Sequence, residues 1–265
     1  MKPASFAYAR PKDWSHAVTL VAAGARPGAG TQSLGPLLNL RLAQPDTIAD
    51  LRHLPDYAGV AAAGGVVRIG AGTTHAAIED GAVPGRVGEI MASIARGIAY
   101  RPVRNRGTIG GSLAHADPAA DWVAVLPALG ATAVALGPRG ERRIASARFV
   151  TGILETALAA DELLRFIDVP VLPVEARWGH WKFCRKVGEF SKATGCVLAL
   201  PGESPRAVLA ALDRPPLVIE DASALVADPA AEASRIIGRV ADLAPWRRAI
   251  AETALRRAVE RMAAA

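Results

Sequence analysis

The stretch RPVRNRGTIGGSLAHADPAADW, from Arg101 to Trp122, has few side chains that would fill a core and many glycine, hydroxyl and charged residues. Its loop Gly107–Ser112 places glycines beside hydroxyl side chains. Because glycine has no Cβ, several backbone N–H groups of such a loop can approach a phosphate closely. Another loop of this kind, Gly28–Ser33, lies nearer the N-terminus; it is the first loop in chain order, and Gly107–Ser112 is the second. One such loop alone is most often a tight turn, but two of them suit a pyrophosphate.

Neither loop matches a standard nucleotide-binding motif. No Gly-Lys-Ser/Thr follows as in a P-loop, and neither is a Gly-x-Gly-x-x-Gly fingerprint after a strand. The five histidines show no spacing typical of a metal site, and Gly-x-Ser-x-Gly is absent, so metalloenzyme and serine hydrolase functions lose their usual support. We expect one of these histidines, His75, to be structural.

Charged residues flank the second loop on both sides. Asp121 falls in the first turn of a predicted helix, where the helix dipole favours a carboxylate. It is either a helix cap or an acceptor of hydrogen bonds from the hydroxyls of a bound sugar or ribityl chain. Before the loop, Arg101, Arg104 and Arg106 would form a solvated face, or would pair with phosphate or with an acidic partner.

Outward from this stretch, hydrophobic periodicity predicts helices and strands in uneven alternation. The expected helices are Asp13–Gly24, Arg86–Gly97, one that opens at Pro118, Pro229–Ala241 and Ala244–Met262. The expected strands are Val66–Ile69, the hairpin Thr132–Leu136 with Glu141–Ile144, Glu162–Val169, Arg177–Val187, Ala193–Leu200 and Leu217–Ile219. The segment Pro170–Arg177, with two prolines, is the best linker. We therefore expect an α+β architecture with two subdomains before this linker and a smaller α/β unit after it.

Composition narrows the class of protein. The 265 residues are 51% hydrophobic, which excludes a disordered chain. Two cysteines are too few for a disulfide framework, a four-thiolate zinc site or an iron–sulfur cluster, and a reducing cytoplasm fits them best. We expect no membrane span, because no uncharged apolar run reaches roughly 18 residues. The net charge of +6 is weak evidence for nucleic-acid binding, and we expect none.

Several segments, taken in order, resemble the FAD-binding medium subunit of the molybdenum hydroxylases, the group that contains carbon monoxide dehydrogenase and xanthine dehydrogenase. These segments are GAGTQSLGPLLNLRLAQP, IGAGTTHAAIE, RPVRNRGTIGGSLAHADPAADW and DELLRFIDVP. The likeness covers about Met1–Pro170, and FCRKVGEFSKATG extends it into the C-terminal unit. A run as long as RNRGTIGGSLAHADPAAD is far more specific than a lone glycine motif.

The resemblance implies a vanillyl-alcohol-oxidase-like, PCMH-type FAD-binding fold. Residues 1–172 would form the FAD-binding domain, with subdomains at about 1–58 and 59–172 that clasp FAD, and residues 173–265 would form a small C-terminal α/β domain. The cofactor-binding residues implied in this way are Ala29, Gly30, Thr31, Gln32, Ser33, Leu34, Ile98, Thr108, Ile109, Gly110, Gly111, Ser112, Asp121 and Lys192. Both loops would wrap the diphosphate and ribityl chain through backbone N–H groups.

The resemblance also implies a relay role with no acid–base catalytic residue. The chain would work in a heterotrimer, doubled by symmetry, with a small iron–sulfur subunit and a large molybdopterin subunit. Its FAD would pass electrons to NAD, a quinone, oxygen or another acceptor. Two alternatives stay open: a stand-alone FAD-dependent reductase or oxidase of the same fold, and a non-catalytic basic scaffold.

Two features depart from the family's pattern. The first loop of relatives usually reads Ala-Gly-Gly-Gln-Ser, whereas Thr31 replaces the second glycine here. We expect Thr31 to interfere with FAD only if this residue needs a positive φ, and relatives near xanthine dehydrogenase carry a non-glycine there. The C-terminal domain also looks shortened after Gly202, which affects expected partner contacts more than flavin contacts.

Overall fold

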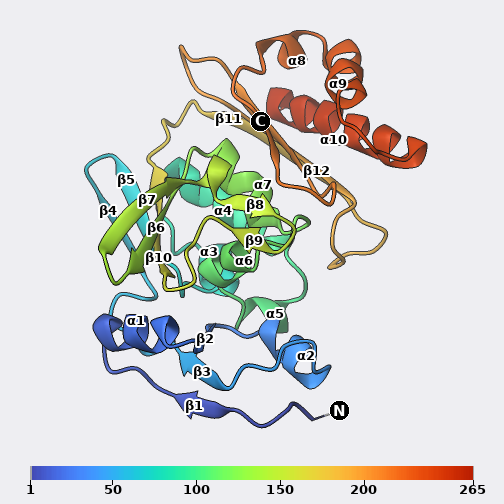
Figure 1. Ribbon diagram of the computed structural model, residues 1–265. Coiled ribbons are helices and arrows are strands. Elements are labelled where there is room, and N and C mark those ends of the chain that lie inside the picture. Colours follow the sequence, from blue (N-terminus) through green and yellow to red (C-terminus); the bar gives the residue numbers. More distant parts are fainter. Residues whose placement is uncertain (1, 265) are drawn as a thin grey trace.

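Three main sheets follow one another along the chain in the computed structural model, which describes residues 2–264 (Figure 1). The first sheet has the strand order β1-β3-β2, and both strand pairs are parallel. Its elements are β1 Ala7–Ala9, α1 Trp14–Ala22, β2 Arg26–Gly28, α2 Leu34–Asn39 and β3 Thr47–Asp50. Helix α1 buries its apolar face, and the Asp13 carboxylate caps it by accepting from the His16 N–H.

The second sheet is antiparallel, with the strand order β4-β5-β10-β6-β7. Its strands are β4 Val60–Ala63, β5 Val66–Gly70, β6 Thr132–Gly137, β7 Gly140–Ala145 and β10 Leu163–Pro170, and a small pair is formed by β8 Val150–Gly152 and β9 Glu155–Thr156. The helices inserted between β5 and β6 are α3 His75–Glu79, α4 Gly85–Arg96, α5 Arg101–Arg104, α6 Ile109–His115 and α7 Asp121–Ala128, and a 3-10 turn, η1, spans Ser146–Arg148.

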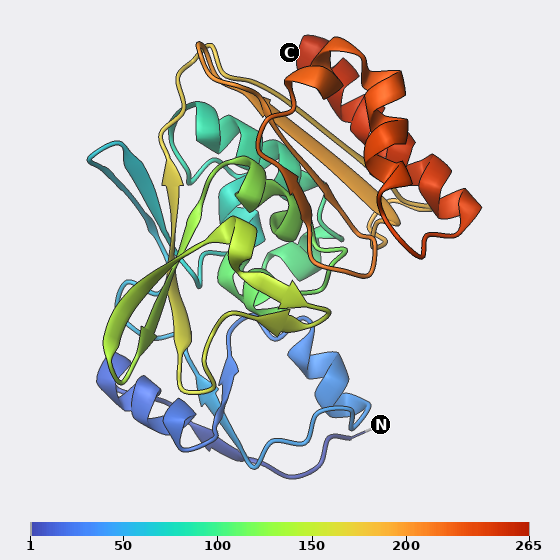
Figure 2. The same cartoon turned by 45° about the horizontal axis from the view of Figure 1, so that its top comes forward.

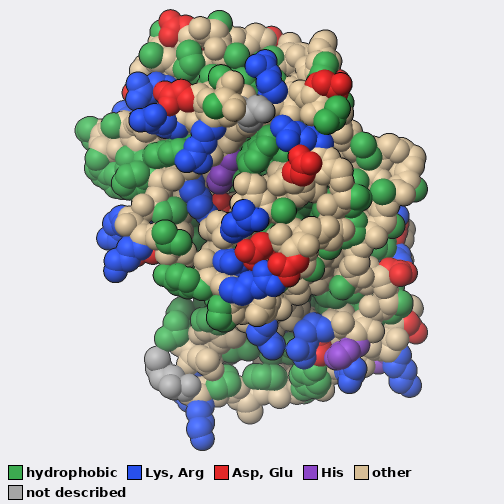
Figure 3. Space-filling model, turned by 180° about the vertical axis from the view of Figure 1, so that it is seen from behind, with side chains coloured by type: hydrophobic (Ala, Val, Ile, Leu, Met, Phe, Trp, Pro, Cys, Tyr) green, Lys and Arg blue, Asp and Glu red, His purple; other side chains and the backbone are tan. Residues whose placement is uncertain are grey.

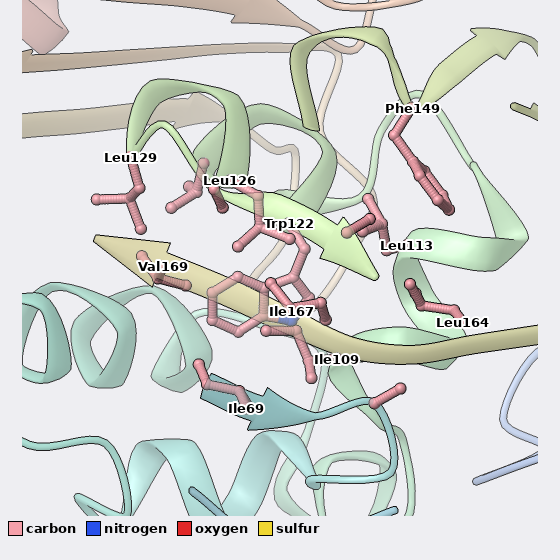
Figure 4. Close-up of a cluster of buried hydrophobic side chains, with 14 of the residues drawn as sticks. Ile69, Ile109, Leu113, Trp122, Leu126, Leu129, Phe149, Leu164, Ile167 and Val169 are labelled. Carbon is pink, nitrogen blue, oxygen red and sulfur yellow. The ribbon is translucent and has the colours of Figure 1, made fainter. Parts of the chain in front are cut away.

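The main core lies between this sheet and the inserted helices. Figure 4 shows Ile69 of β5 and Ile167 of β10 beside Ile109 of α6 and Trp122 of α7, and all four side chains are buried. Helix α7 is buried along its whole length, which explains why its sequence is aliphatic on every side. The loop Gly107–Ser112 is therefore anchored at one end to a closely packed helix layer.

The C-terminal unit is a four-stranded antiparallel meander covered by helices (Figure 2). Its elements are β11 Arg177–Phe183, β12 Ala193–Ala199, β13 Arg206–Ala210, β14 Leu217–Ile219, α8 Ser223–Ala227, α9 Pro229–Gly238 and α10 Pro245–Ala264. A Cβ on Gly179 or Gly195 would lie 1.9 or 2.4 Å from a backbone oxygen of α10, so these glycines let the helix lie close to the sheet. In this unit all four strands precede the helices, whereas the α/β unit that we expected would have strands and helices in alternation.

Most elements expected from sequence are present, including the helices α1, α4, α9 and α10 and the hairpin β6–β7. The helix expected to open at Pro118 begins at Asp121 instead. The Asp117 carboxylate accepts from the Ala119 N–H, and the Asp117 carbonyl accepts from the Ala120 N–H. This turn delays the helix. No helix within residues 2–264 is long and apolar enough to cross a membrane.

The segment before α7 is also where the C-terminal unit meets the rest of the chain. The Pro118 carbonyl accepts from the Ala211 N–H at 2.9 Å, and the Ala119 carbonyl accepts from the Ser191 hydroxyl at 3.3 Å. Helix α7 also packs against β12 and β13. The start of α7, including Asp121, therefore lies at the junction of two units.

Candidate functional site

The first glycine-rich loop connects the end of β2 to the start of α2 and carries a row of free donors. None of the six backbone N–H groups from Ala29 to Leu34 donates a hydrogen bond to another group of residues 2–264. The Gln32 side-chain amide donates to the Gly30 carbonyl at 3.1 Å, so this contact does not occupy any of the six backbone N–H groups. Consecutive free N–H groups are the donor set that binds a phosphate or pyrophosphate.

The two glycine-rich loops lie against each other. A Cβ on Gly30 would stand 1.8 Å from the Arg106 carbonyl oxygen and 2.9 Å from the Gly107 Cα, so only glycine fits at this point. A Cβ on Gly111 would stand 3.7 Å from the Ala29 Cβ. The structure therefore brings together the two segments that the sequence singled out, although they are about 80 residues apart.

Residues 109–112 of the second loop form the start of helix α6, and this segment offers fewer free donors than we expected. Its N–H groups from Ile109 to Ser112 all bond within the chain, so they are not free to wrap a diphosphate. They donate, in order, to Thr73 O at 3.0 Å, Ala71 O at 2.9 Å, Thr108 Oγ1 at 3.0 Å and Thr108 O at 2.9 Å. The Thr108 N–H has no partner among the described residues. The second loop thus supports the first mainly by packing.

Thr31 has the positive φ under which we expected its side chain to interfere with FAD. Its φ is +57°, in the left-handed region that a β-branched residue rarely adopts. The chain therefore adopts a backbone conformation that favours glycine while carrying a β-branched side chain there. Strain of this kind persists only where neighbouring contacts fix the backbone, and here the Thr31 carbonyl accepts from the Gly35 N–H at 2.8 Å.

Asp121 is the first residue of α7, and its side chain does not act as the N-cap. The N-cap is Ala120, which has no side-chain bond, and the Asp121 carboxylate instead meets Lys182 of β11. Both carboxylate oxygens lie 2.9 Å from Lys182 Nζ, and His180 Nε2 lies 3.7 Å from one of them. Burial raises the pKa of the Asp121 carboxyl, and the Lys182 ammonium opposes that rise. Neither Lys182 nor His180 was predicted as a site residue from the sequence.

The remaining predicted residues lie at the edges of this region. Ile98 follows α4, is half-buried and packs against the main core. The Lys192 side chain is exposed, and its N–H donates to the Phe183 carbonyl at 2.8 Å, at the base of the hairpin between β11 and β12. Neither side chain forms a hydrogen bond with another predicted site residue.

Of the three loop arginines, Arg101 and Arg106 are exposed, as expected of a solvated face, whereas Arg104 is buried and corrects that expectation. Arg104 is 8% exposed and binds both carboxylate oxygens of Glu79 at 2.7 and 3.1 Å. Arg101 binds Glu79 and Asp80. Arg106 stays exposed and forms no ion pair among residues 2–264.

His75 is structural, as expected. Its Nδ1 accepts a hydrogen bond from the Trp122 indole N–H at 3.1 Å, and burial lowers the pKa of its imidazole to about 4. A neutral imidazole is therefore the form that joins α3 to α7 at neutral pH.

Behind Asp121 the surface is hollowed. A cavity of about 420 Å³ lies between α4, β11 and α10, and Figure 3 shows a hollow on this face with a histidine between basic side chains. The lining includes Ser93, Trp178, His180, Lys182 and Arg261. None of the residues predicted to bind FAD lines this cavity, but Lys182 of its lining contacts the Asp121 carboxylate.

One protein family and several known proteins resemble this chain in sequence. The family described as "FAD binding domain in molybdopterin dehydrogenase" matches residues 4–172. The carbon monoxide dehydrogenase medium chain of Afipia carboxidovorans is 38% identical over 202 residues, 75% of this chain and 70% of that protein. The nicotine 6-hydroxylase medium subunit of Paenarthrobacter nicotinovorans is 38% identical over 176 residues, 66% of this chain and 62% of that subunit.

Solved structures match over the full length. Carbon monoxide dehydrogenase from Hydrogenophaga pseudoflava, in a form lacking the Mo-pyranopterin moiety, superimposes with a TM-score of 0.91 at 30% identity and covers 100% of this chain and 99% of that one. Quinoline 2-oxidoreductase from Pseudomonas putida 86 has a TM-score of 0.86 at 25% identity over the same shares. The matched region includes the C-terminal unit, which we described from the sequence as shortened after Gly202.

The matches confirm the predicted flavin-binding fold, FAD as the cofactor and the oxidoreductase class. The chain therefore belongs to the family of the FAD-binding domain in molybdopterin dehydrogenases and resembles the medium subunits among its members.

Proposed function

We propose that this chain is the FAD-carrying medium subunit of a molybdenum-hydroxylase complex. It would relay electrons from the iron–sulfur clusters of a small partner subunit to an external acceptor. A large molybdopterin subunit would hold the organic substrate, and the three chains would form a heterotrimer that dimerises. Support comes from the medium subunits that this chain resembles and from a loop whose six free N–H groups suit a diphosphate.

One observation carries the proposal: the free N–H groups from Ala29 to Leu34 in a loop pressed against Gly107. These residues fit FAD because a diphosphate supplies several anionic oxygens for consecutive donors. Thr31 adopts a positive φ, yet the six N–H groups of the loop have no partner among residues 2–264, and Gly30 allows the close approach of the second loop. FAD, when bound, supplies the redox chemistry, and the chain supplies placement and electrostatics.

The other predicted residues would act toward different parts of the cofactor. The Asp121 carboxylate would accept hydrogen bonds from ribityl hydroxyls, since a carboxylate has lone pairs beyond those that Lys182 uses. Ile98 would offer an apolar surface beside the isoalloxazine ring, and Lys192 a positive charge near it. No acid–base residue is needed for this role.

Titration of the flavin-free chain with FAD and with FMN tests the proposal. We expect one FAD per chain and much weaker binding of FMN, because FMN lacks the diphosphate. Purification from the native source should also recover a cysteine-rich chain and a larger chain. Full turnover of an organic substrate by the isolated chain would instead establish a stand-alone flavoenzyme, and a chain that binds no flavin would favour the scaffold alternative.

A further inference from the structure

Helix α2 ends in an ordered turn that holds two leucines in solvent. Leu40 is 50% exposed and Leu42 is 73% exposed. The Arg41 N–H donates to the Leu38 carbonyl at 3.0 Å, and the Leu42 N–H donates to the Leu37 carbonyl at 2.9 Å. This pair of bonds is a Schellman motif, which fixes the backbone at the end of a helix. The two leucines are therefore held at the surface by a fixed backbone.

The needs of the turn itself do not explain these side chains. In a Schellman motif the residue at the position of Leu42 commonly packs back on the helix, but Leu42 stays largely exposed. The preceding position is usually glycine, whereas Arg41 occupies it here with a φ of +58°, which a side chain disfavours. Backbone strain of this kind is concentrated at binding sites. The turn is thus less stable than one with glycine, yet it places an arginine between two exposed leucines.

The surroundings of the turn are basic. The Arg41 Nε donates to the Lys2 carbonyl at 3.2 Å, so the N-terminal segment lies beside the end of α2 (Figures 1 and 2). Neither residue forms an ion pair within the part of the chain that the structure describes. Over residues 2–45 there is one acid, Asp13, which caps α1, against five bases: Lys2, Arg10, Lys12, Arg26 and Arg41. The next acid, Asp46, directly precedes β3. An apolar centre with a positive rim fits apolar side chains framed by carboxylates.

We propose that this surface, formed by Lys2, Leu40, Arg41 and Leu42, docks the iron–sulfur subunit through carboxylates placed around apolar side chains. The inference rests on the proposed function. In that function the iron–sulfur subunit must contact this chain, because electrons pass from its cluster to FAD only over a short distance. The turn is near the cofactor loop, since α2 begins at Leu34, the last residue of that loop, and its six residues span about 9 Å.

The native complex, purified through a tag on the full-length chain, allows a direct test. The fraction of the cysteine-rich chain that stays bound on dilution gives its dissociation constant. We expect Leu42→Asp to raise this constant at least about tenfold, because it places a carboxylate against carboxylates and apolar side chains. Val174→Asp is the matched control, since Val174 is 78% exposed in the linker, and it should keep the wild-type value. An unchanged constant in Leu42→Asp, or an equal rise in Val174→Asp, would overturn the inference.

Arg41→Gly separates docking from folding. Glycine suits a φ of +58°, so this variant should unfold at a higher urea concentration than wild type, and weaker docking in it cannot come from misfolding. Loss of the guanidinium should slow association with the iron–sulfur subunit and make the association rate less sensitive to salt. Association as fast and as salt-sensitive as in wild type would count against the proposed surface.

Carbodiimide coupling of the native complex identifies the chain that occupies the surface, because this reagent joins an ammonium to a carboxylate in contact with it. We expect Lys2 to be joined to an Asp or Glu of the cysteine-rich chain. A link from Lys2 to the larger chain or to a second copy of this chain, or no link, would overturn the inference. Wild type that purifies without a cysteine-rich chain refutes the proposed function itself. Wild type that retains this chain, with unaltered dissociation in Leu42→Asp, refutes only the docking surface.

Discussion

Gly30→Ala should damage flavin binding through one added methyl group. The new Cβ would lie 1.8 Å from the Arg106 carbonyl oxygen, whereas ordinary contacts of a Cβ begin at 3.4 Å. The two loops must therefore part by more than an ångström. Overpacking of this kind costs about 1–3 kcal/mol of folding free energy.

The same displacement moves donors away from the diphosphate. A hydrogen bond to a charged group contributes about 1.5–3 kcal/mol, so losing one bond weakens FAD binding by roughly 10- to 150-fold. Quenching of flavin fluorescence gives the dissociation constant, and urea unfolding of the flavin-free chain gives the stability.

Gly35→Ala is the matched control in the same segment. Gly35 is in the first turn of α2, and a Cβ there meets no atom within 4 Å. We expect this variant to keep wild-type FAD affinity and to gain about 0.4–1 kcal/mol of stability. Our interpretation of the loop contact is refuted if Gly30→Ala binds FAD as tightly as Gly35→Ala does.

Three further predictions follow from individual side chains. Asp121→Ala should weaken FAD binding by about 1–3 kcal/mol, and an unchanged FAD affinity in a titration would leave Asp121 a purely structural role. Thr31→Gly should raise the urea midpoint modestly, because about 1–2 kcal/mol of left-handed strain is offset by about 0.5–1 kcal/mol of glycine entropy. Arg104 lowers the pKa of Glu79, so this pair stabilises the fold above the unfolded value of 4.5, and the stability is lost as the pH falls through the folded value. Arg104→Met should flatten that acid dependence in unfolding measurements, and an unaltered slope would contradict it.

Elements defined by local pattern were predictable. Helix α4 shows its apolar face at helical spacing, and the hairpin β6–β7 carries Pro and Gly in its turn. The first sheet was not predictable in this way, because its strands have three or four residues and pair in parallel across α1 and α2. Strand β13 was missed as well, since two of its five residues are alanines that weaken the strand signal.

The glycine-rich loops of the candidate site were predictable from the local sequence, whereas the ion pairs between residues far apart in the chain were not. Glycines beside hydroxyl residues indicated both loops, and the structure presses them together at Gly30. The partner of Asp121 is Lys182, 61 positions later on another unit, and no local pattern joins them. Arg104 likewise looked like part of a solvated loop because its partner, Glu79, lies 25 positions earlier. Long-range ion pairs depend on the tertiary fold, which spacing along the chain does not encode.

One measurement tests most directly the proposal that the Ala29–Leu34 loop holds a diphosphate. Amide resonances of the flavin-free chain can be followed by NMR during titration with FAD and, separately, with FMN. FAD should shift the N–H resonances of this loop at one equivalent, whereas FMN at the same concentration should leave them near their starting positions. FAD binding that leaves these six amides unshifted, or equal affinity for FAD and FMN, would contradict it.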